Sequence, residues 1–138
     1  MSTILQTQTT SFKKELYEGI HDLTTDVLKI ALYTASANLN EGTTAYSTSN
    51  EVTGTGYVAG GVEMTGVTVS SSGFTAYVGF ANVVFGAAVT ARCALIYNSS
   101  KANRAIAVLD FGSDKTSADF TITMPTNSAT SALIRSSN

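Results

Sequence analysis

The chain has 138 residues, a formal net charge of −2 and a charged fraction of 13%, which is about half the usual share in globular proteins. This length indicates one domain with a hydrophobic core of its own. The weakly acidic balance disfavours a nucleic-acid-binding protein, which needs a basic surface to neutralise phosphates. Ser, Thr, Asn and Gly must supply most of the polar surface, and such a surface costs less to desolvate in a protein contact than one rich in Lys and Glu.

Cysteine content and hydropathy bear on the compartment. The sole cysteine, Cys93, excludes an intrachain disulfide, and its apolar surroundings favour a buried side chain over a reactive thiol. The N-terminal segment has no charged region followed by a long apolar one, so we expect no secretory signal peptide. No segment approaches the roughly 18 apolar residues of a membrane span. We therefore expect a soluble protein, made in the cytoplasm, without a membrane partner.

The N-terminal third begins with polar sequence and continues into the first regular elements. Residues 1–11 hold too few apolar side chains to build a core and are expected to form an arm. Residues 12–20 show helical spacing, with Ser11 as N-cap and Gly19 at the end, although an irregular arm is an equal alternative. Residues 26–34 alternate in polarity and predict a strand.

The middle of the chain predicts a long loop and two further strand regions. Residues 35–56 form a polar stretch longer than an ordinary connection, and such loops are usually functional or mobile. Residues 57–64 predict a strand in which Gly60 and Gly61 indicate a bulge or a close backbone approach. Residues 67–80 predict a β-hairpin with its turn at 70–73 and with Phe74, Ala76, Val78 and Phe80 on one face.

The stretch from Thr90 to Phe111 predicts the central hairpin of the fold. Its two apolar arms, 94–97 and 105–109, flank an Asn- and Ser-rich turn. A turn over 112–118 and a strand over 119–125 follow, and Pro125 ends that strand. The apolar triplet 132–134 in the tail predicts an edge strand or a contact arm. Together these elements predict an all-β fold, a single-domain β-sandwich of the jelly-roll type.

No residue cluster in the chain indicates catalysis. His21 is the only histidine, so a metal or triad site would have to begin there, and a structural or surface role is the simpler interpretation. The glycines of 54–61 lack the strand–loop–helix context of a phosphate loop. Asp110, Asp114 and Asp119 lack the regular spacing of a calcium loop. The aromatic side chains fall at strand spacing and suit a core or interface better than a sugar platform. We expect no enzyme activity, cofactor or metal.

Several motifs in succession resemble a family of small virion proteins of tailed bacteriophages. These are FKKELYEGIHDL, DVLKIALYTASANL, NEVTGTGYVAGG, FTAYVGFANVVF, ARCALIYNSSKANRAIAVLDFG and DFTITMP. The most specific parts are KIALYT, NE-x4-GY-x2-GG, and ALIYN followed by VLDFG. The resemblance covers residues 12–125 and is strongest to capsid cement, or decoration, proteins. It implies a jelly-roll or β-sandwich module that assembles as an oligomer on the outer capsid surface.

The resemblance and the residues together lead to an expected domain plan and function. We expect an N-terminal arm (1–11), a β-domain (12–125) and a C-terminal tail (126–138). The expected partners are the major capsid protein and further copies of the chain, as a dimer or trimer. The two termini and the 35–56 loop would reach across subunit boundaries. Their apolar residues are the candidate interface residues: Ile4, Leu5, Leu39, Tyr46, Leu133 and Ile134.

Two other functions remain open from the sequence. One is a head-to-tail connector, tail or fibre-attachment protein, since small β-sandwiches also occur there. The other is a glycan-binding adhesion module with aromatic and Asn or Asp side chains on its loops. An enzyme is the least supported class.

Overall fold

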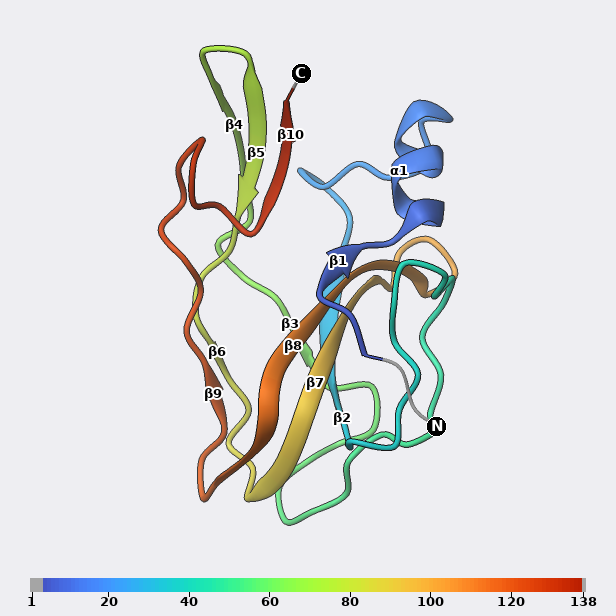
Figure 1. Cartoon of the computed structure of the whole chain (residues 1–138), viewed down its shortest axis with the longest axis vertical. Coiled ribbons are helices and arrows are strands. Elements are labelled where there is room, and N and C mark those ends of the chain that lie inside the picture. The colour runs from blue at the N-terminus through green and yellow to red at the C-terminus, as the bar shows by residue number, and fades with distance from the viewer. Residues whose placement is uncertain (1–3, 138) are drawn as a thin grey trace.

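The hairpin of β7 (Val89–Asn98) and β8 (Arg104–Ser117) forms the centre of the fold, as predicted. The structure is a computed structural model that describes residues 4–137. In the hairpin turn Ala102 and Asn103 adopt positive φ, and Lys101 and Arg104 close it through backbone hydrogen bonds. The two strands pair antiparallel over nearly their whole length, with register shifts near Arg92 and Ile96 (Figure 1).

The hairpin is the middle of a five-stranded main sheet with the order β1-β8-β7-β2-β3. Here β1 is Thr7–Gln8, β2 is Leu28–Tyr33 and β3 is Val62–Glu63. All described pairings in this sheet are antiparallel. The strand predicted over 26–34 is confirmed as β2, and nearly all of its residues are buried because both faces of the sheet are covered. Gly61 adopts positive φ against the backbone of Ile30, which confirms the close approach predicted there.

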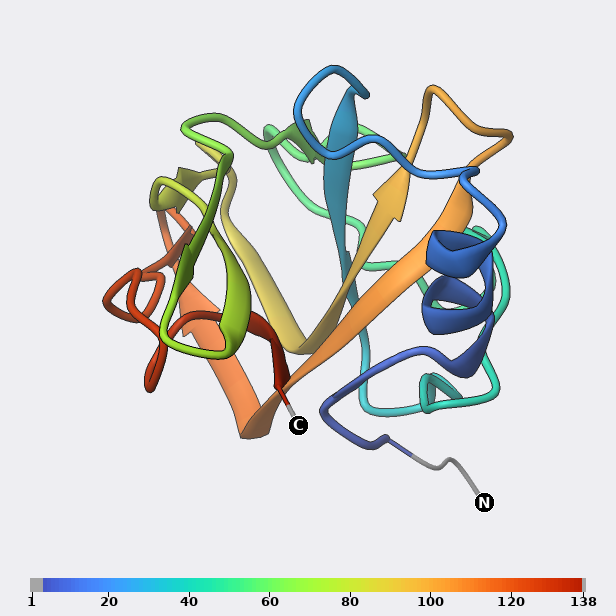
Figure 2. The same cartoon turned by 90° about the horizontal axis from the view of Figure 1, so that it is seen from above.

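Two smaller sheets complete the fold. The small sheet has the order β10-β5-β4, with β4 at Thr68–Ser72, β5 at Thr75–Gly79 and β10 at Ile134–Ser137. A two-stranded ribbon joins β6 (Val83–Val84) to β9 (Thr121–Ile122). Figure 1 shows the β4–β5 hairpin extending beyond the main sheet, at the same end of the molecule as the helix. Figure 2 shows the two on opposite sides when viewed from above.

Helix α1 (Thr10–Tyr17) confirms the helical interpretation of the N-terminal segment. Its N-cap is Thr9, not Ser11: the Thr9 hydroxyl accepts a hydrogen bond from Phe12 N at 3.1 Å. Thr9 is also fully buried against β8, where its backbone N–H donates to the carbonyl of Ile106. The cap therefore fixes the start of the helix to the main sheet, a tertiary contact that the local sequence does not reveal.

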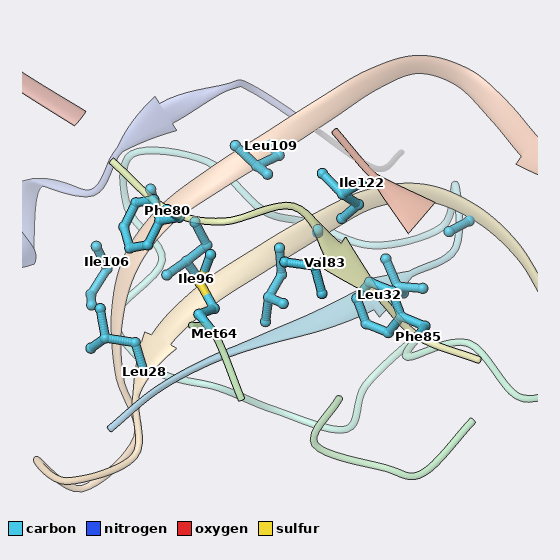
Figure 3. Packing of buried hydrophobic residues seen from close by; sticks show 14 of the residues in the cluster. Leu28, Leu32, Met64, Phe80, Val83, Phe85, Ile96, Ile106, Leu109 and Ile122 are labelled. Atoms are coloured by element: carbon cyan, nitrogen blue, oxygen red, sulfur yellow. The ribbon is translucent and has the colours of Figure 1, made fainter. Parts of the chain in front are cut away.

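The core consists of two clusters, one on each face of the main sheet. The larger cluster joins β2, β7 and β8 to the ribbon and the small sheet, and Figure 3 shows Leu32, Ile96 and Ile106 of the main sheet facing Phe80, Val83 and Ile122. The second cluster includes Leu95 and Tyr97 on the opposite face and is covered by the 35–56 segment through Ala37 and Leu39. The predicted polar loop is thus packed against the sheet.

Three predictions in the second half of the chain are wrong. The turn predicted at 70–73 lies at 73–74, because 70–72 pair with β5 as part of β4. Residues 112–117 continue β8 instead of turning, because Lys115, Thr116 and Ser117 pair with β7. Their polar composition fits an exposed strand as well as a turn. Phe74 does not share the buried face of Val78 and Phe80, since it lies in the two-residue turn at the hairpin tip, where alternation no longer applies.

Both terminal segments have strand partners. Residues Thr7–Gln8 pair with Val108 and Ala107 of β8, and Ile4 forms a parallel bridge with Leu39. At the other end β10 pairs along β5, so the tail contributes an edge strand. Antiparallel sheets with a single short helix confirm the predicted all-β class for residues 4–137. In the same range no helix is long and apolar enough to cross a bilayer.

A candidate docking groove between helix and small sheet

A groove of about 810 Å³ separates α1 from the small sheet. One wall is the helix with the segment 19–24, and the other is the face of β4, β5 and β10 that carries aliphatic side chains. Figure 1 shows the helix and the small sheet at the same end of the molecule. The register aligns Val69, Val78 and Ile134 in one row across this face. We call this space the docking groove; its walls include Leu16 and Tyr17 of α1 and Val69, Ala76, Val78 and Ile134 of the small sheet.

Apolar side chains on the walls of the groove are open to solvent. Tyr17 is 93% exposed, Leu16 42% and Val69 48%. Phe74, at the tip of the hairpin that forms the second wall, is 94% exposed. Exposed aromatic and aliphatic side chains gathered on one concave surface are typical of sites that bind another protein.

Few charged residues line the docking groove. No charged residue occurs between Glu63 and Arg92, so the whole β4–β5 hairpin is uncharged. Lys13 and Arg135 lie on opposite walls of the groove, and Asp22 is the acidic residue among its lining. The lining of the groove is therefore largely neutral, with two cationic groups and one carboxylate.

Buried polar groups hold α1 in place beside the groove. Glu15 accepts hydrogen bonds from Arg104 Nη1 and His21 Nε2, both at 2.8 Å. Burial would raise the pKa of Glu15, but the hydrogen bonds from His21 and Arg104 outweigh it and hold that pKa below its ordinary value. The helix is thus bound to Arg104, the first residue of β8, where the turn of the central hairpin ends.

Asn98 connects this cluster to a second acidic side chain. Its Nδ2 lies 2.9 Å from His21 Nδ1 and 2.7 Å from Asp26 Oδ2. Because an amide nitrogen only donates, His21 Nδ1 must accept, and the His21 proton is on Nε2, where it donates to Glu15. This arrangement gives His21 a structural role, one of the two that the sequence interpretation named.

Asp26 is the most strongly perturbed carboxylate of the network. It accepts hydrogen bonds from Lys101 Nζ at 2.8 and 3.0 Å as well as from Asn98. Burial opposes its ionisation, yet the bonds from Lys101 and Asn98 lower the pKa of Asp26 to about 2. The segment before β2 is therefore anchored to the central turn by a charged pair.

A second polar cluster fixes the segment that covers the other face of the main sheet. The Glu51 carboxylate accepts hydrogen bonds from the hydroxyls of Tyr46 and Tyr57, each at 2.6 Å, and from Gly60 N at 2.8 Å. Burial, followed by the hydrogen bond to Glu51, raises the pKa of both tyrosines well above the ordinary value. With three donors on one carboxylate, this cluster holds the long loop in place.

The six interface residues predicted from the sequence do not form one surface. Leu39 and Ile134 are buried within the chain, and Ile4, Tyr46 and Leu133 are partly buried. Only Leu5 is largely exposed, at 47%. Ile134 lines the docking groove, whereas the Tyr46 ring stacks on Tyr97 at 4.7 Å between centroids.

The structure also places the residues considered for chemistry. Cys93 is fully buried, and burial raises the pKa of its thiol to about 12. Asp110 pairs with Arg92 at 2.7 Å and Asp119 accepts from Gly86 N. Among residues 4–137 no group of three or more His, Cys, Asp or Glu side chains is arranged to hold a metal ion.

Sequence reasoning missed the exposed residues that define the groove. Tyr17 and Leu16 lie on a helix whose direction is set by the buried network, and Val69 lies on a strand that is placed by its pairing with β5. The run of 28 residues from Met64 to Ala91 without a charge could have indicated the wall that carries Val69. It does not extend to Leu16 or Tyr17, for which the local sequence gives no signal.

Comparison with protein-family models, with curated proteins and with solved structures gave no match.

Proposed function

We propose that this chain is a bacteriophage virion structural protein of the capsid cement type, which binds the outer capsid surface and bridges subunits of the major capsid protein. The observation that carries the proposal is the docking groove, whose opposing walls expose Tyr17 and Val69 on a largely neutral surface. The motifs between residues 12 and 125 that resemble cement proteins supply the identity of the partner.

The fold supports such a role in a physical sense. A bridging protein needs a rigid fold and a binding surface whose desolvation costs little free energy. In this chain both faces of the main sheet are covered by core clusters, and the β4–β5 hairpin has no charged residue. We also propose that the frame is a β-sandwich of jelly-roll type, because the small sheet and the ribbon pack across one face of the main sheet. On a symmetric shell many weak contacts add through multivalency.

The test is binding of the purified chain to capsids of its own phage from which the chain has been removed. We expect the chain to co-sediment with these capsids, and Tyr17→Ser to reduce its occupancy at least about tenfold, since an exposed aromatic anchor contributes 1 to 2 kcal/mol or more. Lys115→Ser, on exposed β8 away from the groove, is the matched control and should bind normally. Failure of the unchanged chain to bind would refute the cement proposal.

A further inference from the structure

Strand β4 is an open edge without the usual protection. It lies at the end of the small sheet, and within residues 4–137 its backbone pairs with β5 alone. Edge strands are normally blunted by charged side chains, proline or bulges, because unpaired N–H and C=O groups invite another strand. The sequence of β4, TVSSS, has none of these, and the nearest charged residue along the chain before it is Glu63.

The hairpin turn fixes which backbone groups point outward. The loop has two residues, Gly73 and Phe74, and Gly73 has φ of +60°, as in a type II′ turn. In such a hairpin Ser72 and Thr75 exchange both hydrogen bonds, and every second pair along the strands does the same. Val69 and Ser71 therefore direct their N–H and C=O groups away from β5, to the open edge.

We propose that β4 pairs antiparallel with β4 of a second copy of this chain, about a two-fold axis at Ser70. In this register Val69 of each copy exchanges two backbone hydrogen bonds with Ser71 of the other, and Ser70 faces its own equivalent. Because no charged side chain lies on the strand, the self-pairing brings no like charges together. The two small sheets become one continuous sheet.

The same register accounts for Phe74. Counting outward from Ser70 places Phe74 of one copy beside Gly66 of the other, at the base of the partner hairpin. Gly66 carries no side chain and is followed by the half-buried Val67. An aromatic side chain that is 94% exposed in the single chain would thus be covered in the pair.

The symmetry has a consequence for the docking groove. A two-fold axis between antiparallel strands of one sheet is perpendicular to that sheet, so both copies present the same face on the same side. The aliphatic rows that include Val69 and Val78 would then form one wider surface with a groove on each flank. This pairing does not depend on the proposed virion function, since it needs no capsid.

The contact area sets the expected strength. Edges of five residues bury less than the roughly 800 Å² per partner of a standard stable interface. We therefore expect a reversible dimer with a dissociation constant no tighter than about micromolar. Such a pair would be populated at high protein concentration and where copies are held close together.

Cysteine cross-linking tests the register, because Cys93 is fully buried and an introduced surface cysteine is the accessible thiol. Directly opposed, non-hydrogen-bonded residues have Cα atoms about 4.5 Å apart, within disulfide range. At about 50 μM under mild oxidation we expect Ser70→Cys to dimerise at least about tenfold faster than Ser36→Cys, an exposed control on another loop. Thr68→Cys alone should remain slow, whereas a mixture of Thr68→Cys and Ser72→Cys should cross-link.

Equal rates of cross-linking for Ser70→Cys and Ser36→Cys would overturn the pairing, and rapid self-linking of Thr68→Cys would overturn the register.

A second test, without introduced cysteines, measures the association of the chain by sedimentation equilibrium. Ser71→Pro removes one outward N–H while leaving the hydrogen bonds to β5, so it should be monomeric and folded, whereas Ser71→Ala should associate like the unchanged chain. Association of Ser71→Pro at the unchanged affinity would contradict the proposal. Neither measurement involves capsids, so its failure is distinct from failure of the cement proposal.

Discussion

The Asn98 amide nitrogen lies 2.9 Å from His21 Nδ1, although the two residues are 77 positions apart in the chain. The contact joins the turn of the central hairpin to the segment after α1. Because Asn98 also donates to Asp26 and accepts from Ser100 N, one fully buried amide organises the side of the molecule that bears the docking groove.

Replacement of Asn98 by Ala should therefore destabilise the protein strongly. Loss of the amide leaves the buried His21 Nδ1 without its donor and removes one hydrogen bond from Asp26 Oδ2, which keeps the bond from Lys101 Nζ. We therefore expect a loss of about 2 to 3 kcal/mol in the free energy of unfolding. Urea denaturation measures this change. Ser99→Ala, at the half-buried neighbouring position, removes a single hydrogen bond to the carbonyl of Val27 and should cost about 1 kcal/mol or less. Equal losses in both variants would contradict the role given to Asn98.

Asp26 should make stability depend on pH in strongly acidic solution. Its pKa is lowered from 3.8 to about 2 on folding, so its stabilising contribution is present above about pH 4 and is lost as the pH falls towards 2. Thermal unfolding between pH 2 and 5 should show a steeper decline for the unchanged protein than for Asp26→Asn. Parallel profiles would show that Asp26 is not the responsible group.

Gly61 should tolerate no side chain. It has φ of +79°, and a Cβ atom there would collide with the carbonyl of Ile30 in β2. Gly112 has a similar φ of +83° but open space around it, so Gly112→Ala isolates the cost of the backbone conformation. We expect Gly61→Ala to lower the unfolding free energy by at least about 2 kcal/mol more than Gly112→Ala. Similar losses in urea denaturation would exclude the predicted clash.

Leu95 should be essential for folding, since it is fully buried in β7. Leu95→Asp would bury an unpaired charge, and we expect the chain to lose its cooperative unfolding transition and near-ultraviolet dichroism. Thr90→Asp places the same charge on an exposed position of the same strand and should leave the fold intact. A folded Leu95→Asp protein would contradict the assignment of this hairpin as the core.

The strongly patterned segments were predictable and the long-range pairings were not. Residues 26–34 and the hairpin at 90–111 combine apolar runs with clear turn residues, so local sequence defines them. The pairing of β10 with β5, and that of β1 with β8, joins segments distant in the chain. Such edge pairings depend on tertiary packing, which no local pattern encodes.

The docking groove also depends on tertiary packing, so local sequence does not predict it. The groove walls come from α1 and from the small sheet, and their separation is set by the contacts of Thr9, Glu15 and His21 with the central hairpin and its turn. Composition did indicate a neutral surface suited to protein contact. It could not indicate that Tyr17 and Val69 would be exposed on the two sides of one groove.

The measurement that tests the cement proposal most directly is an electron-microscopy map of the phage particle that carries this chain. We expect density for the chain at repeated positions over the outer capsid face, with α1 and the β4–β5 hairpin against the major capsid protein. Density confined to the head–tail junction or the tail, or a particle that lacks the chain, would contradict it.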